Sequence, residues 1–333
     1  MKTRHIVNLG FILALLIAGC APVVNGSQDD KLNAVATVSP ITNIIYNIGG
    51  NHITLSGIVP EGVNSHTFEP APSDAKKLAG ADLIFANGLD LEDPTLELAR
   101  ANLKDGAEIV ILGEQTISPE KYAYDFSFPK EEGHPNPHLW PNPIYALRYA
   151  EIAKDALVRR DPADADYYKG NYEKFKARIE ALDEAIMATI NSIPENNRKL
   201  LTYHDSFAYF APRYGMTIIG AIQPSDFSEP SARDVANLIT QIKEEKVPAV
   251  FGSEVFPSPI LEQIAKESGA KYVSDLRDDD LPGVPGEAKH SYVGLMVEDV
   301  RIMAEVLGGD PSLIASFDVS NVPGKDQDVN QSQ

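Results

Sequence analysis

Short β-rich runs alternate with amphipathic helical segments along most of this 333-residue chain. The β-rich runs of the first half are "NAVATVS", "ITLSGIV", "DLIFANG" and "EIVIL". Those of the second half are "RKLLTY", "TIIGAI", "AVFGSE" and "KYVSD". Alternation of this kind is typical of parallel sheets that are covered by helices on both faces. We therefore predict an α/β fold with two lobes, each a parallel β-sheet flanked by helices.

A long segment of good helix formers, residues 161–194, separates the two halves and contains no proline between Pro162 and Pro194. About thirty residues at 1.5 Å each would make a rod of roughly 45 Å. We predict one long rigid helix that joins an N-terminal lobe (residues 32–160) to a C-terminal lobe (residues 195–315) and limits hinge motion. A long helix inside a single domain is the alternative, and complete β/α sets on both sides disfavour it.

The two ends of the chain differ in composition from the lobes. Residues 1–20 join a short basic region, an apolar run and Cys20, which is typical of a secretory signal peptide. The stretch "LIAGC" resembles the bacterial lipobox, and Cys20, the only cysteine, has no disulfide partner. We predict that Cys20 is lipidated; an ordinary signal peptide ending near a chance cysteine is the alternative. Residues 21–31 would then be a flexible tether and residues 316–333 a disordered tail.

The formal net charge of −19 argues against a nucleic-acid partner, because phosphates would repel the chain. The same charge suits a soluble protein that handles cations, and we expect the protein to be a monomer. We expect the mature protein to be lipid-anchored to a bacterial membrane, at the cell surface or on the periplasmic side.

Four side chains follow predicted strands at the edge where ligands of parallel α/β sheets bind. They are His66, His138, His204 and Asp275, two from each half. Any one alone would pass for an ordinary surface or core residue. Together they predict a metal site in a cleft between the lobes.

The stretch "EGHPNPHLWPNP" surrounds two histidines with four prolines. Proline removes a backbone donor and restricts the residue before it, so this segment is a stiff loop and no helix. We assign the ligand to His138, because prolines bracket it and Trp140 can pack the loop onto the lobe. His134 lies on the charged side of the loop and is expected to be an exposed histidine.

Three imidazoles and one carboxylate suit zinc, whereas calcium and magnesium prefer all-oxygen ligands. Manganese remains the competitor, since imidazole and carboxylate both serve it. Because imidazole binds metal in its neutral form, the affinity is expected to fall as the pH drops through about 6.5.

The sequence resembles the metal-binding solute receptors of bacterial ABC transporters, which serve zinc and manganese uptake. The similar stretches are "NSHTFEP", "NPHLWPNP", "YHDSFAYF", and "SDL" followed by "SYVGLMVEDV", within residues 32–309. The resemblance implies that His66, His138, His204 and Asp275 hold the metal between two lobes bridged by a long helix. Manganese receptors of the family frequently carry glutamate where this chain has His204, which favours zinc.

The resemblance also implies delivery of the ion to a membrane permease that is powered by a separate cytoplasmic ATPase. Asp278, Asp279 and Asp280 are rival carboxylates, and Asp275 is preferred because it ends a strand. His290 begins the last helix and is expected to be a capping or surface residue. We therefore predict a zinc solute-binding protein that is not an enzyme, with a manganese receptor as the alternative.

A secreted zinc hydrolase is the alternative from another class. Four protein ligands would leave no vacancy for a catalytic water, and neither HExxH nor GxSxG is present in the chain. A surface adhesin is a further possibility, but the sequence contains no separate adhesive module.

Overall fold

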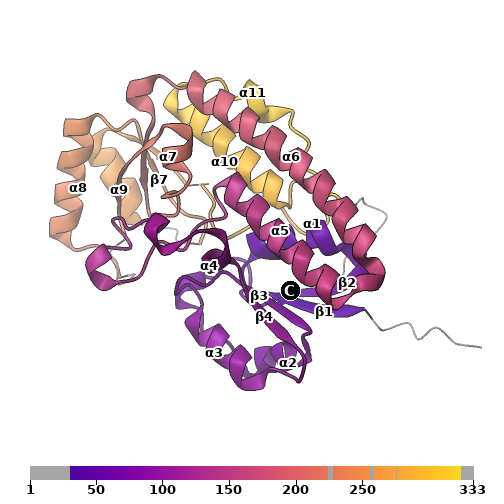
Figure 1. Cartoon of the computed structure of the whole chain (residues 1–333). Helices are drawn as coiled ribbons and strands as arrows, with labels where there is room; N and C mark the ends of the chain where they lie inside the picture. Colours follow the sequence, from indigo (N-terminus) through magenta and orange to yellow (C-terminus); the bar gives the residue numbers. More distant parts are fainter. Residues whose placement is uncertain (1–30, 224–227, 256–258, 275, 324–333) are drawn as a thin grey trace, which may run out of the picture. The chain divides into compact units, whose positions relative to one another are not determined.

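The structure, a computed structural model, describes residues 31–223, 228–255, 259–274 and 276–323. It contains two four-stranded sheets, one in each half of the chain (Figure 1). Their strand orders are β2-β1-β3-β4 and β6-β5-β7-β8, and every pairing is parallel. The prediction of two parallel α/β lobes is confirmed.

Strands and helices alternate as the sequence indicated. The strands are β1 Leu32–Ala36, β2 Ile53–Gly57, β3 Leu83–Ala86, β4 Glu108–Ile111, β5 Lys199–Thr202, β6 Thr217–Ala221, β7 Ala249–Phe251 and β8 Lys271–Val273. The helices of the first half are α1 Ser39–Gly49, α2 Pro72–Gly80, α3 Asp93–Asn102, α4 Leu112–Thr116 and α5 Pro143–Arg160. The remaining helices are α6 Ala165–Ser192, α7 Ala211–Tyr214, α8 Ala232–Glu245, α9 Pro259–Ser268, α10 Tyr292–Leu307 and α11 Ser312–Ala315.

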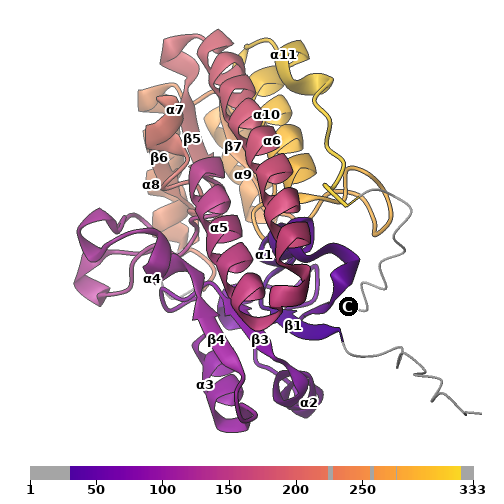
Figure 2. The same cartoon turned by 45° about the vertical axis from the view of Figure 1, so that its right-hand side comes forward.

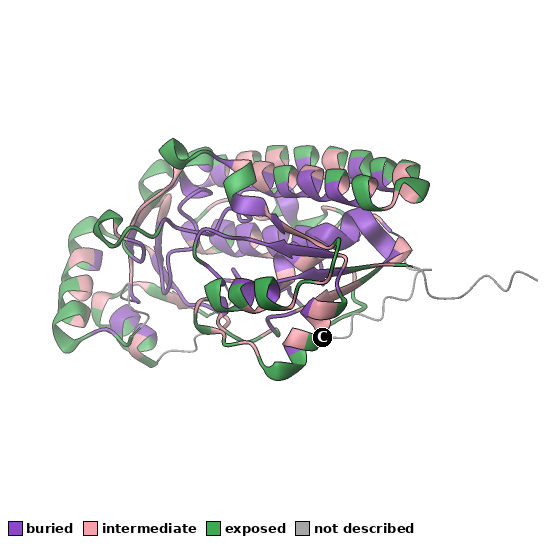
Figure 3. Cartoon of the chain, turned by 60° about the horizontal axis from the view of Figure 1, so that its bottom comes forward, coloured by how far each residue is buried: buried purple, intermediate pink, exposed green. Residues whose placement is uncertain are grey.

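The long helix α6 has 28 residues, which corresponds to a length of about 42 Å. Its buried side chains recur every three or four residues, as expected for one apolar face of a helix; among them are Tyr168, Phe175, Ile179, Leu182 and Ile186. This face packs against α1, α5 and α10, and the opposite face is exposed (Figures 2 and 3). A single hydrophobic core therefore includes residues of both lobes and of α6.

Residues 316–323, the start of the predicted disordered tail, form defined contacts with α6 and α1. The guanidinium of Arg178 lies 3.1 Å from the Asp318 carboxylate. Asn47 donates to the Asn321 side chain at 2.9 Å and accepts from the backbone N–H of Val322 at 2.8 Å. Residues 316–323 are thus ordered and packed against the rest of the protein, whereas the sequence predicted a disordered tail.

Each sheet has a position at which the direction of winding reverses: between β1 and β3 in one, and between β5 and β7 in the other. Ligands of open α/β sheets bind beyond the carboxyl ends of the strands at such positions. His204 lies two residues beyond β5 and Glu254 three residues beyond β7. The topology of the second sheet thus brings polar residues to this edge.

None of the helices in the described ranges combines the length and the apolar composition that a bilayer span needs.

Candidate metal centre

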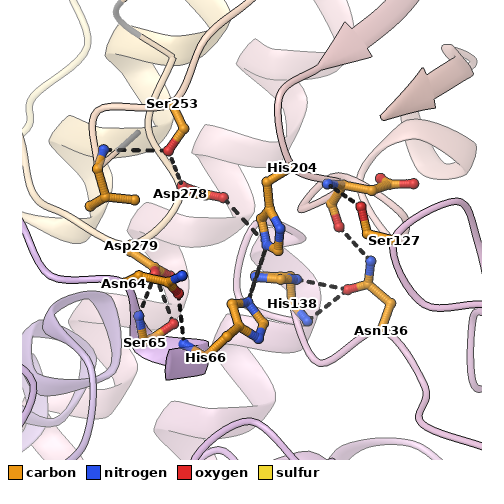
Figure 4. Close-up of polar contacts among 12 residues, drawn as sticks. Asn64, Ser65, His66, Ser127, Asn136, His138, His204, Ser253, Asp278 and Asp279 are labelled. Carbon is orange, nitrogen blue, oxygen red and sulfur yellow. Dashed lines mark hydrogen bonds and ion pairs between the residues drawn. The ribbon is translucent and has the colours of Figure 1, made fainter. Parts of the chain in front are cut away.

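The three predicted histidines lie on different elements but point to one place (Figure 4). His66 belongs to a single helical turn, Ser65–Thr67, in the loop after β2, and the Asn64 side chain accepts from its backbone N–H at 2.9 Å. His138 lies in the proline-rich loop before α5, and His204 follows β5.

Their Nε2 atoms form a nearly equilateral triangle. The His66–His138 and His66–His204 distances are both 3.1 Å, and the His138–His204 distance is 3.0 Å. Tetrahedral zinc with Zn–N bonds of 2.0–2.1 Å has N···N edges of about 3.3–3.4 Å. The three nitrogens could therefore hold one metal ion with shifts of a few tenths of an ångström.

Two of the three imidazoles are buried, and His66 is half-buried. His138 is 0% and His204 3% exposed, and the ring of the buried Phe128 lies 5.5–5.8 Å from all three imidazole rings, centre to centre. Burial lowers the pKa of His66 and His138 well below the usual value, and neighbouring imidazoles lower it further. Burial also lowers the pKa of His204, to about 3, although a hydrogen bond with Gln223 opposes the shift. The imidazoles are thus held neutral, which is the form that binds metal.

Asn136 fixes the orientation and the tautomer of His138. Its Oδ1 accepts from the backbone N–H and from Nδ1 of His138, each at 2.9 Å. Its Nδ2 donates to Asp125 Oδ2 at 2.7 Å and to the Asp205 carbonyl at 2.6 Å, which settles the assignment of the amide. Because an amide oxygen only accepts, Nδ1 of His138 carries the proton and Nε2 presents its lone pair to the triad.

One carboxylate of the C-terminal lobe approaches the triad. Asp278 Oδ2 lies 3.9 Å from His204 Nε2, and Ser206 hydrogen-bonds the same side chain. Burial raises the pKa of Asp278 well above its usual value, and the negative charges of Glu254 and Asp279 raise it further. A cation beside Asp278 would relieve this repulsion.

The remaining predicted residues have different environments. Asp275 lies outside the described residues. His134 is 64% exposed and pairs with Asp90 at 2.8 Å, as expected for a surface histidine. His290 is not a surface residue: it is 3% exposed, and its Nε2 lies 3.4 Å from Glu61. Ser291, rather than His290, is the N-cap of α10.

Sequence reasoning missed Asn136 and Phe128. The signal for Asn136 was present, since it stands two residues before His138 in a segment that prolines make rigid. Phe128 lies in an irregular stretch with no periodicity, and nothing in the sequence pointed to it. Trp140 does pack its loop as predicted: it is fully buried, and its Nε1 donates to the Asp278 carbonyl at 2.8 Å.

Two parallel α/β lobes that share a core along one long helix, with three neutral imidazoles converging between them, define a two-lobed metal-binding protein. A sequence model of the family described as zinc-uptake complex component A, periplasmic, matches residues 34–306. The chain belongs to this family, the metal-binding solute-binding proteins of ABC transporters.

Individual relatives differ in the metal that they are named for. The iron-binding protein YfeA of Yersinia pestis is 31% identical over 295 residues, covering 88% of this chain and 92% of its own. The manganese ABC transporter substrate-binding lipoprotein PsaA of Streptococcus pneumoniae is 28% identical over 295 residues, covering 84% and 90%. The solved structure of the periplasmic zinc-binding protein TroA from Treponema pallidum matches with a TM-score of 0.76 at 25% identity, covering 83% and 99%.

Proposed function

We propose that this protein captures Zn²⁺ between its two lobes and delivers it to an ABC permease powered by a separate ATPase. The observation that carries the proposal is the triangle of Nε2 atoms with edges of 3.0–3.1 Å. Three ring nitrogens this close together can either share protons as hydrogen bonds or hold a cation among them, and a cation would use all three lone pairs. His66, His138 and His204 would supply three ligands of a four-coordinate site.

A carboxylate of the C-terminal lobe would supply the fourth ligand. Asp278 is the candidate among the described residues, because its Oδ2 lies 3.9 Å from a proposed ligand nitrogen. Asp275, which the family resemblance indicates, is the alternative. A filled fourth position disfavours a zinc hydrolase, which needs that position for water.

Zinc is proposed on the donor set, since relatives are named for iron, manganese and zinc. Nitrogen donors favour zinc over manganese, which binds carboxylate-rich sites more readily. Manganese is the second candidate, because the donors also include a carboxylate.

The relatives' names also support placement outside the cytoplasm through a lipid anchor. We propose Cys20 as the attachment site; it lies outside the described residues. Mass spectrometry of the membrane-extracted protein tests the modification.

Protein purified without added metal, from cells grown with zinc, manganese and iron, is expected to carry zinc as its main transition metal. Elemental analysis is more informative than titration of the stripped protein. In titrations, zinc outcompetes manganese at most nitrogen-containing sites, whichever metal the protein carries in the cell. Chelator competition with the stripped protein then gives both affinities. Predominant manganese or iron in the purified protein would refute the zinc assignment.

The pH dependence of binding is expected to reflect Asp278 more than the histidines. The pKa of each imidazole is lowered, so the metal-free triad already lacks protons near pH 6.5 and releases few on binding. The pKa of Asp278 is raised, so its carboxyl takes up a proton at a higher pH than an ordinary aspartate does, and the metal must displace that proton. Affinity should therefore fall as the pH drops through the raised pKa of Asp278, by about tenfold per pH unit for one displaced proton.

Calorimetry in two buffers of different ionisation enthalpy at pH 7 counts the protons that zinc releases. The wild type is expected to release more protons than Asp278→Asn, because only the wild type has the carboxyl with the raised pKa. Release of several protons with a midpoint near 6.5 would show that the imidazoles titrate normally and that the metal-free triad is open to water.

A further inference from the structure

Glu254 organises the turn that carries the proposed carboxylate ligand. It lies just beyond β7, and its Oε1 accepts three consecutive backbone N–H groups. The N···O distances are 3.1 Å for Asp278, 3.1 Å for Asp279 and 2.9 Å for Asp280. Consecutive N–H groups converge on one oxygen only if the backbone curls around it. The carboxylate therefore defines the shape of residues 278–280.

Charge alone does not account for a glutamate at this position. The turn already bears three aspartates, and a fourth carboxylate adds repulsion. What Glu254 contributes is a carboxyl oxygen that accepts several backbone donors at once.

The first aspartate of the turn faces the triad. The Asp278 carboxylate lies 3.9 Å from His204 Nε2, while its backbone carbonyl accepts from the Trp140 indole at 2.8 Å. Both the amide and the carbonyl of Asp278 are thus held from outside the turn, by Glu254 and by the loop that carries His138.

The other two aspartates hold the loop that carries His66. Asp279 Oδ2 accepts from the hydroxyl of Ser65 at 2.7 Å and from its backbone N–H at 3.3 Å. Asp280 Oδ2 accepts from the backbone N–H of Gly62 at 2.7 Å. The turn of the C-terminal lobe is therefore hydrogen-bonded directly to the N-terminal lobe, next to one of the histidines (Figure 4).

We propose that Glu254 is a positioning residue for metal capture: it shapes the 278–280 turn so that Asp278 reaches the ion while Asp279 and Asp280 hold the His66 loop across the cleft. This inference rests on the proposed function, because it assigns Asp278 to the metal. It makes tight binding depend on a residue that does not touch the ion.

The test compares Glu254→Ala and Glu254→Gln in the full chain, with Glu262→Ala on the exposed face of α9 as the matched control. Zinc affinity is measured by chelator competition. Amide hydrogen exchange of the metal-free protein, resolved by residue, reports the turn independently of the metal. Outer residues that orient ligands change metal affinity by about 10- to 100-fold when replaced.

Glu254→Ala should lose that factor in zinc affinity and the protection of amides 278–280, with α8 and α9 unchanged. Glu254→Gln keeps an acceptor oxygen and should lose less of both, and Glu262→Ala should match the wild type. Should the alanine variant fail to fold, faster exchange confined to amides 278–280 in Glu254→Gln supports the proposal, and unchanged exchange there overturns it.

The outcomes separate this inference from the proposed function. Loss of protection at 278–280 without loss of zinc affinity overturns the positioning role while the metal function stands. Equal losses in Glu254→Gln and Glu254→Ala also overturn it, because the charge and not the acceptor would then matter. A wild-type protein that binds no transition metal refutes the proposed function, whatever the exchange data show.

Discussion

Replacing His138 with alanine is expected to weaken zinc binding roughly 100- to 1,000-fold. Zinc sites with four protein ligands have apparent binding free energies on the order of 10–16 kcal/mol, so one ligand accounts for roughly a quarter of that. Each 1.4 kcal/mol corresponds to a tenfold change in affinity. Chelator competition at pH 7.5 measures the loss.

His134→Ala is the matched control, because it removes the other imidazole of the same loop. His134 is 64% exposed and its partner is the surface residue Asp90, so zinc affinity should stay within about twofold of the wild type. A comparable loss in both variants would contradict the assignment of His138 and would point to a disturbed loop.

His138 is fully buried, so the alanine variant also tests stability. Thermal unfolding of the metal-free proteins separates the two effects. A ligand role predicts that the zinc-induced increase in the unfolding temperature is largely lost in His138→Ala, beyond any decrease in the metal-free value. An unchanged increase would exclude His138 from the site.

The sequence was sufficient to predict what local patterns determine. Alternation predicted the parallel sheets, and the position of His204 just beyond β5 follows from the general geometry of such sheets. The prolines that bracket His138 correctly indicated that His138 is packed into the protein and that His134 is exposed. These features depend on periodicity and on backbone restriction, both of which can be read from neighbouring residues.

Long-range hydrogen bonds determine the features that the sequence could not predict. Which of Asp278, Asp279 and Asp280 faces the histidines depends on how residues 278–280 curl, and Glu254, more than twenty positions away, accepts hydrogen bonds from all three backbone N–H groups. The order of residues 316–323 likewise comes from Asn47 and Arg178, which lie far away in sequence. A polar segment with no apolar periodicity gives no local sign of such partners.

The second large expected effect is the loss of zinc affinity when the fourth ligand, either Asp278 or Asp275, is replaced. Asp278→Asn removes the anion but keeps a side chain of nearly the same shape, so zinc affinity should fall roughly 10- to 100-fold. Asp275→Asn should leave the affinity almost unchanged if Asp278 is the ligand. The reverse result would assign the metal to Asp275.

Asp278→Asn should also change the stability of the metal-free protein, in the direction opposite to its effect on zinc affinity. The pKa of Asp278 is raised in the folded protein, so the stability tied to its protonated form is present below the unfolded pKa, near 3.9. That stability is lost as the pH rises through the folded pKa. Above its folded pKa the wild-type protein thus bears the cost of a buried carboxylate beside Glu254 and Asp279, and the asparagine variant does not.

Metal-free Asp278→Asn should therefore unfold at the same or a higher temperature than the wild type at pH 8, while its zinc-induced stabilisation is smaller. A residue that only supports the fold would lower both quantities. Because a ligand site tolerates a repulsion that the metal relieves, stability gained together with affinity lost is the result that identifies Asp278 as part of the site. A parallel decrease in the two would instead assign Asp278 to the packing of the 278–280 turn.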